Sequence, residues 1–127
     1  MLETYFQELL EAIAASPIVR LHDVTLDKRA PRAGLIRGDL YFADSSRSHF
    51  RELVEFQTNI VRLRYSYHYQ RADNSLIFRY DDTAHYSDLP NFSHHKHVGD
   101  ETDVVPASPP DLHAVLREIE ATYPLDE

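Results

Sequence analysis

The sequence predicts an α+β protein: an antiparallel meander sheet of about five strands, with an N-terminal and a C-terminal helix packed on one face. Apolar residues recur at helical spacing near both ends of the chain. Between these segments the apolar period changes to two, and short turns separate the stretches, which favours a meander covered by the helices. Three glycines and no glycine-rich phosphate loop argue against a dinucleotide-binding fold.

The two helices are predicted from their apolar stripes. The first covers residues 2–15 and ends at Ser16-Pro17, because proline breaks the helical pattern. The second covers residues 109–122, with Ser108 as its cap and two prolines in its first positions. Its buried stripe is predicted to contain Leu112, Val115, Leu116 and Ile119.

Five strands are predicted between the helices. The first, Ile18 to Lys28, has an alternation that slips near His22-Asp23, as a β-bulge would produce. The others are Gly34 to Phe42, Ser48 to Gln57, Ile60 to Gln70 and Ser75 to Asp82. Residues 83–107 are predicted to form a long loop with four histidines, and the whole chain, residues 1–127, is predicted to be one domain.

Composition narrows the possible functions. The chain contains no cysteine, which excludes disulfides, thiolate zinc sites and a cysteine nucleophile. It has no run of 18 apolar residues and no N-terminal segment of the signal-peptide kind, so we expect a cytoplasmic protein without a membrane partner. The net charge is −8, but it divides into −3 for residues 1–19, +4 for 20–79 and −9 for 80–127. The basic middle is either an anion-binding face or a solvated mixture of charges.

Residues of the fourth predicted strand separate by parity onto two faces. One face is predicted to carry Leu63, Tyr65, Tyr67 and Tyr69, and the other Arg62, Arg64, Ser66, His68 and Gln70, joined by Ile77, Arg79 and Asp81 of the next strand. Arginine forks and a histidine suit a phosphodiester, and tyrosines can stack on bases. The alternatives are a solvated face with an Arg64–Asp81 ion pair, and a tyrosine stripe that belongs to the core.

A second cluster, His94-His95-Lys96-His97, follows in the predicted loop, after His85 and Asp88. It is interpreted as an acid/base group that contacts phosphate, as a metal site or as a solvated loop. The spacing matches no zinc signature, and the cation of Lys96 would repel a metal ion while assisting a phosphate. We therefore predict neither a metal site nor a cofactor.

Several long segments of the chain resemble the TumE-type toxins of prokaryotic toxin–antitoxin pairs. They are Arg62 to Gln70, Leu76 to Asp81, Asp88-Leu89-Pro90, His94 to Gly99, Ile36 to Leu40 and His49 to Glu52. Two turns depart from the expected pattern, because Ser45 and Asn59-Ile60 stand where glycine is expected. The resemblance implies a small toxin that acts on RNA and is neutralised by a winged helix-turn-helix antitoxin. The motif positions it marks are Tyr67, His68, Arg79, Tyr80, Asp81, His94, His95 and Lys96.

Together these observations lead us to expect a metal-independent endoribonuclease that cleaves by attack of the RNA 2′-hydroxyl. His68 and His95 are the expected acid and base, and Arg64, Arg79 and Lys96 the cations that stabilise the phosphorane. The expected catalytic set is His68, Arg79, His94, His95, Lys96, Tyr67 and Asp81, and the substrate-binding set Arg62, Arg64, Tyr65, Tyr69 and Tyr80.

Two alternative functions stay open at this point. The first is a non-catalytic module that binds protein or nucleic acid. The second is a metal-dependent nucleotidyl-transfer toxin, for which Asp81-Asp82 could supply carboxylates. The expected partners are an antitoxin and RNA, and whether the chain forms a homodimer stays open.

Overall fold

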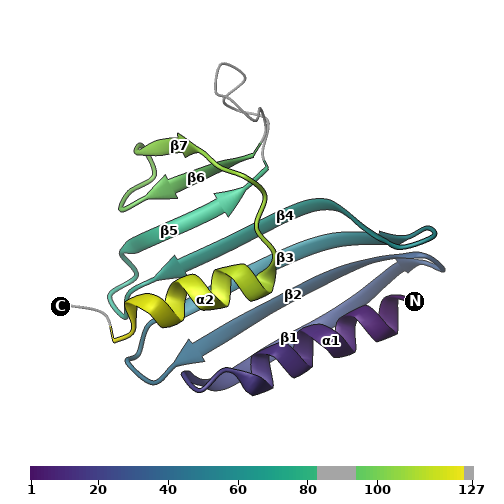
Figure 1. Ribbon diagram of the computed structural model, residues 1–127, viewed down its shortest axis with the longest axis horizontal. Coiled ribbons are helices and arrows are strands. Elements are labelled where there is room, and N and C mark those ends of the chain that lie inside the picture. The colour runs from purple at the N-terminus through teal and green to yellow at the C-terminus, as the bar shows by residue number, and fades with distance from the viewer. Residues whose placement is uncertain (83–93, 125–127) are drawn as a thin grey trace.

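A computed structural model describes residues 1–82 and 94–124, in which one seven-stranded antiparallel sheet is accompanied by two helices (Figure 1). The strands lie in the sheet in the order in which they follow along the chain, so the sheet is a meander. In chain order the elements are α1 (Leu2–Ala15), β1 (Val19–Ala30), β2 (Ala33–Phe42), β3 (Arg47–Phe56), β4 (Ile60–Gln70), β5 (Leu76–Asp81), β6 (His95–Val98), β7 (Val104–Pro106) and α2 (Leu112–Thr122).

The fold class is as predicted, but the sheet has seven strands rather than about five. The two additional strands, β6 and β7, lie within the segment that was predicted to be a loop. They form a short hairpin whose turn contains Gly99 at φ 79°, a conformation that favours glycine. Residues 83–93 of the same predicted loop, with His85, Asp88 and Pro90, lie outside the described residues.

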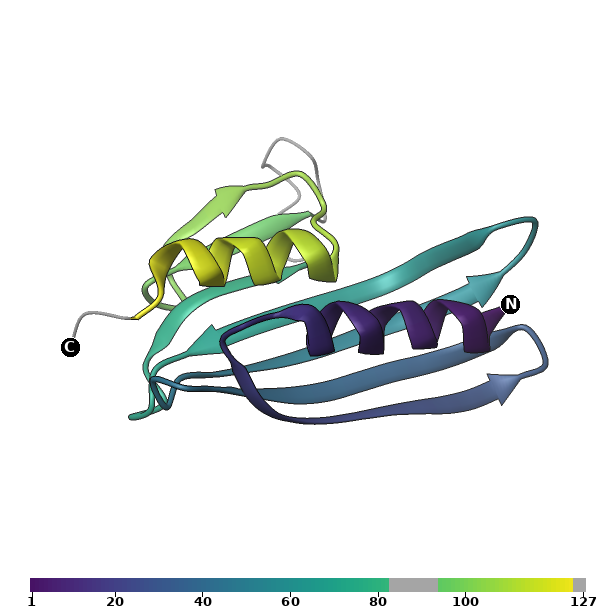
Figure 2. The same cartoon turned by 60° about the horizontal axis from the view of Figure 1, so that its bottom comes forward.

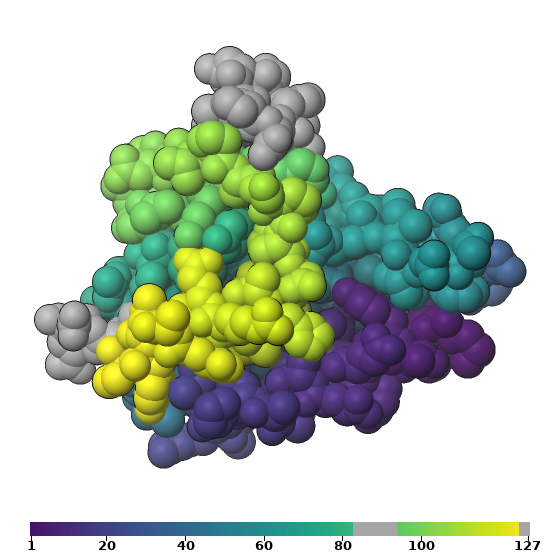
Figure 3. Space-filling model, in the orientation of Figure 1, coloured from purple at the N-terminus to yellow at the C-terminus, as the bar shows by residue number. Residues whose placement is uncertain are grey.

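Both helices pack on the same face of the sheet, as predicted (Figure 2). In the space-filling view both helices are visible on the near side, with α1 in purple and α2 in yellow (Figure 3). The predicted stripe of α2 is buried at all four positions, with Ile119 at 0% exposure. The core lies between these helices and the sheet, where Ile36, Leu40, Phe50 and Tyr67 are fully enclosed. The opposite side of the sheet, which carries no helix, is called the open face below.

A bulge in β4 changes the predicted parity. The pairing of β3 with β4 passes from Leu53↔Arg64 to Val54↔Arg62, so Leu63 is the extra residue of the bulge. Arg62 was predicted to share a face with Arg64, and this is wrong. Its guanidinium lies over the Tyr65 ring, 4.4 Å from the centroid, on the face that the helices cover. Leu63, which was predicted to accompany the tyrosines, is 43% exposed.

Three further local features differ from their predictions. The cap of α2 is Asp111, whose carboxylate accepts a hydrogen bond from the Ala114 amide at 2.8 Å, and not Ser108. In β1 the register shifts lie between Val19 and Leu21 and between Lys28 and Ala30, not at His22-Asp23. Ser45 occupies the left-handed region at φ 71°, which explains why a glycine is expected at this turn.

Neither helix is long and apolar enough to cross a membrane, within residues 1–82 and 94–124.

Candidate functional site

Two adjacent rows of polar side chains cross the open face. Directly paired residues of antiparallel strands project from the same side of a sheet, so the strand register defines each row. The His68 row contains His49 of β3, His68 of β4, Arg79 of β5 and His97 of β6. The Asp81 row contains Arg51, Ser66, Asp81 and His95 of the same four strands. Predicted site residues His68, Arg79, Asp81 and His95 therefore do lie together.

Arg79 contacts both rows and the β6–β7 turn. Its Nε donates to Asp81 Oδ2 at 3.0 Å, and Nη1 and Nη2 bind the two carboxylate oxygens of Glu101 at 2.9 and 2.8 Å. Nη2 also lies 3.0 Å from His97 Nε2. Asp81 is buried whereas the Glu101 side chain is 53% exposed. One carboxylate therefore fixes the guanidinium from inside the protein, and the other covers its outer edge.

Two buried histidines support this arrangement. His95 Nε2 donates to Asp81 Oδ1 at 2.7 Å. His97 Nδ1 lies 2.9 Å from the Glu101 carbonyl oxygen, which can only accept, so Nδ1 carries the hydrogen. His97 Nε2 is then the acceptor for Arg79, and the ring is neutral. Both histidines are 2% exposed, so neither touches a substrate in this arrangement.

Asp81, His95 and His97 are also the described residues that could hold a metal ion, since one ligand atom of each lies within 4.8 Å of the others. Two histidines and a carboxylate are a common ligand set for divalent transition metals. Here the guanidinium of Arg79 lies at 3.0 Å from both Asp81 Oδ2 and His97 Nε2. It takes the lone pairs that an ion would need and supplies positive charge in its place. The cluster therefore fits a metal only if Arg79 moves away.

His68 is half-buried and lies between His49 and Arg79 in the pairing of the strands. Burial lowers its pKa below 6.5, and the positive charge of Arg79 lowers it further. His68 is thus a neutral base at pH 7. Its neighbour His49 is exposed, and His49 Nδ1 lies 2.9 Å from Asp39 Oδ1. The open face therefore presents two histidines of different environment beside an arginine.

Apart from Arg64, the remaining predicted site residues lie on the face that the helices cover. Alternation along β6 separates Lys96 from His95 and His97, and Lys96 Nζ forms an ion pair with Glu118 of α2 at 2.6 Å. Lys96 was predicted to stabilise the phosphorane beside His95, and its position on the opposite face does not agree with this role. Tyr80 also donates to Glu118, at 2.6 Å, and Tyr65 stacks on His94 with the rings 5.8 Å apart. Burial raises the pKa of Tyr65 to about 12, and nearby Asp82 contributes.

Tyr67 and Tyr69 are core residues with 0% exposure. Tyr67 donates a hydrogen bond to buried Glu52 at 2.6 Å and receives one from Arg62 at 2.7 Å. Burial and the charge of Glu52 raise its pKa. The alternative interpretation of the tyrosine stripe, as part of the core, agrees with these positions. Of the predicted substrate-binding residues, Arg64 alone lies on the open face, where it pairs with Asp82 at 3.5 Å rather than with Asp81.

Sequence reasoning did not select His49, Asp39 or Glu101 as site residues. Asp39 and His49 are polar positions on strands whose other face is apolar, and their alternation alone could have placed them on the open face. Only the register brings them beside His68. Glu101 belongs to the β6–β7 turn, and no local pattern connects it with Arg79, which is 22 residues earlier.

The fold and the site define a small α+β protein in which one meandering sheet carries a histidine- and arginine-rich open face. In a comparison with protein families, residues 9–123 match the family described as Toxin TumE. The chain belongs to this family and is the toxin component of a toxin–antitoxin pair, which implies an antitoxin partner. Searches of curated proteins and of solved structures gave no match.

Proposed function

We propose that this toxin is a metal-independent endoribonuclease whose catalytic centre is the His68 row. The observation that carries the proposal is the position of His68, a base with a lowered pKa between a second histidine and a fixed arginine. RNA brings its own nucleophile, so a base, an acid and a cation facing the phosphate are sufficient for cleavage.

In this mechanism His68 accepts the proton of the 2′-hydroxyl while the 2′-oxygen forms a bond to phosphorus. The bond from phosphorus to the 5′-oxygen breaks, and His49 donates a proton to that leaving oxygen. The carboxylate of Asp39, 2.9 Å from Nδ1 of His49, holds this ring in place on the open face. The products are a 2′,3′-cyclic phosphate and a 5′-hydroxyl.

Arg79 would stabilise the phosphorane through the edge that Glu101 covers. Glu101 is exposed and can leave, and a phosphate then takes the same bidentate position. Asp81, His95 and His97 act as positioning residues, because they contact Arg79 or each other and are buried. This assigns His95 a different role from the acid or base that the sequence suggested.

We also propose that the antitoxin partner is a winged helix-turn-helix protein and that the toxin acts in the cytoplasm. These two points rest on the resemblance of the family motifs. Co-expression of the toxin with a neighbouring gene of that fold, followed by co-purification and growth measurement, tests the first point. An antitoxin of another fold would contradict it.

The decisive experiment incubates purified protein with RNA in the presence of EDTA and analyses the new ends. We expect cleavage that leaves a 2′,3′-cyclic phosphate, and its loss in His68→Ala, His49→Ala and Arg79→Ala. The matched control is His113→Ala, which removes an exposed histidine from α2 on the other side of the sheet. In cells, expression of the wild type is expected to arrest growth and to produce discrete new 5′ ends in total RNA.

Two results would overturn this mechanism. Cleavage that stops in EDTA and returns with a divalent metal would assign Asp81, His95 and His97 as ligands, with Arg79 displaced. Growth arrest with intact RNA would exclude cleavage altogether, and nucleotidyl transfer or binding without chemistry would then explain the toxicity.

A further inference from the structure

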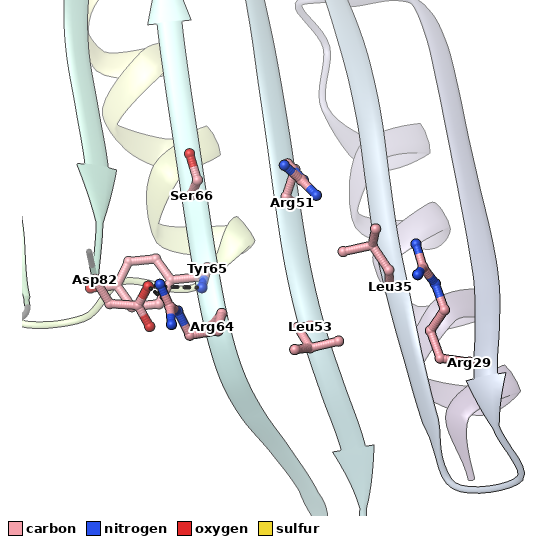
Figure 4. A pocket seen from close by; sticks show the side chains of 8 residues that line it. All are labelled: Arg29, Leu35, Arg51, Leu53, Arg64, Tyr65, Ser66 and Asp82. Carbon is pink, nitrogen blue, oxygen red and sulfur yellow. Dashed lines mark hydrogen bonds and ion pairs between the residues drawn. The ribbon is translucent and has the colours of Figure 1, made fainter. Parts of the chain in front are cut away.

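Beside the proposed catalytic centre, the open face contains a second feature, a pocket of about 410 Å³ between β1 and β5 (Figure 4). Its walls carry the arginines Arg29, Arg51 and Arg64, and half-buried Leu53 and buried Leu35 contribute apolar surface. Figure 4 shows Arg51 on β3, between Ser66 of β4 and Leu35 of β2. The pocket therefore combines positive charge with an apolar surface.

The positive charge that lacks an acidic partner lies at one pair of residues, formed by Arg51 of this pocket and by Arg37, which lines the adjoining hollow. Arg37 of β2 and Arg51 of β3 are directly opposite each other in the register, on the same face. Like charges in this position repel and destabilise a sheet. The other pocket arginines have carboxylate partners, since Arg29 pairs with Asp27 at 3.0 Å and Arg64 with Asp82 at 3.5 Å. Among residues 1–82 and 94–124, neither Arg37 nor Arg51 forms an ion pair within 4.0 Å.

Asp23 and Asp39 line a hollow together with Arg37, but neither forms an ion pair with it within 4.0 Å. The neighbours of the pair along its own row cannot compensate its charge either. They are Thr25 on the β1 side and Ser66 on the β4 side, both neutral. An anion placed between the two guanidinium groups would remove the repulsion and could accept hydrogen bonds from both. Arginine pairs of this kind suit phosphate oxygens, which offer several acceptors to the planar donors.

The pocket is also correctly placed for a strand that passes through the proposed catalytic centre. Arg51 on β3 and Arg79 on β5 are separated by two strand spacings of about 4.8 Å, and their rows lie two residues apart along the strands, about 7 Å, so the two backbones are about 12 Å apart. This is comparable with two successive phosphate-to-phosphate steps in an extended strand. A phosphate beside Arg79 and another one two steps along, beside Arg51, would then belong to the same backbone, with a nucleoside on the Leu35 and Leu53 surface.

We infer that the Arg37–Arg51 pair is a phosphate subsite that holds the RNA backbone about two nucleotides away from the cleaved bond. The inference rests on the proposed function, because it assumes that the open face receives RNA. The inference also specifies the form of the substrate. It is single-stranded RNA, whose unpaired base can reach the pocket wall.

Binding is measured by fluorescence anisotropy of a labelled single-stranded RNA of 12 nucleotides in which every 2′-hydroxyl is methylated. This probe cannot be cleaved, so the wild-type toxin can be used. We expect Arg51→Ala and Arg37→Ala each to weaken binding by about tenfold, as expected for a charge-assisted contact, and to reduce the salt slope by about 0.7. The control Arg117→Ala removes an exposed arginine of α2 and is expected to leave both quantities unchanged.

The outcomes separate this inference from the proposed function. Equal affinities of Arg51→Ala, Arg37→Ala and Arg117→Ala for the probe would overturn the subsite. Loss of binding in the two open-face variants, with no cleavage of unmodified RNA by the wild type, would support the subsite and overturn the nuclease. Thermal unfolding of each variant shows whether it is folded. A duplex bound more tightly than the single strand would contradict the single-stranded substrate form.

Discussion

At the scale of single residues, the carboxylate of Glu101 determines how accessible Arg79 is to a substrate. It forms two contacts with the guanidinium from an exposed turn, so in the proposed mechanism a phosphate has to replace it. We expect Glu101→Ala to lower KM for RNA by about two- to fivefold, the range that an exposed ion pair accounts for. Steady-state cleavage kinetics measure the change. A lower kcat with unchanged KM would instead show that Glu101 positions Arg79.

His68 should titrate at a lower pH than an ordinary histidine. Burial and Arg79 both disfavour its protonated form, so the acidic limb of the kcat/KM profile is expected below pH 6.5. The unfolded chain binds this proton more readily, so the contribution of His68 to stability falls as pH decreases below 6.5. NMR titration of the His68 ring measures the midpoint directly. In Arg79→Met the midpoint should rise, because one cause of the shift is removed.

The residues of the candidate site differ in how far the sequence could identify them. Period-two alternation placed His68, Arg79 and Asp81 on one face, and the register agrees. Arg62 was misplaced because a β-bulge adds one residue and leaves no mark in an alternating sequence. His95 and Lys96 were grouped as neighbours in a loop, but in a strand they point to opposite sides.

At the scale of secondary-structure elements, the start of α2 depends on Asp111 rather than on Ser108. The Asp111 side chain accepts the Ala114 amide hydrogen, which would otherwise lack a partner in the first turn. We expect Asp111→Ala to reduce the free energy of unfolding by about 1 kcal/mol. Urea denaturation measures it, with Ser108→Ala as the matched control that should change little. Equal losses in the two variants would contradict this cap assignment.

Long elements with strong periodicity were predictable, and short ones were not. The stripes of both helices and strands β2 to β5 have enough residues to reveal their period. Strands β6 and β7 have four and three residues, too few for a period to be recognised. The cap was missed because Ser108 precedes two prolines, a strong start signal, whereas the helix begins only after them.

At the scale of the whole molecule, a buried polar network connects the helices with the sheet. Glu52 of β3, with 0% exposure, accepts hydrogen bonds from Tyr5 of α1 and Tyr67 of β4. Arg62 donates to Tyr67 and to the Pro110 carbonyl that precedes α2. The network therefore joins four parts of the chain around one carboxylate, which needs these donors because it is enclosed.

We expect Tyr67→Phe to destabilise the protein by about 1.5–3 kcal/mol, because Glu52 loses a charge-assisted hydrogen bond. RNA cleavage by the folded fraction should be unchanged, since Tyr67 lies in the core and not on the open face. Urea denaturation and cleavage rates below the transition provide the two measurements. A variant of normal stability that does not cleave RNA would restore the catalytic role that the sequence suggested for Tyr67.

The meander order of the strands also affects how the site forms during protein synthesis. Each strand pairs with the one made just before it, so the sheet can extend strand by strand as the chain leaves the ribosome. Arg79 emerges with β5, but His97 and Glu101, which hold it, are translated later. A ribosome halted before residue 101 therefore carries a nascent toxin whose proposed site is incomplete. With the proposed function, activity begins only after the β6–β7 hairpin has left the exit tunnel.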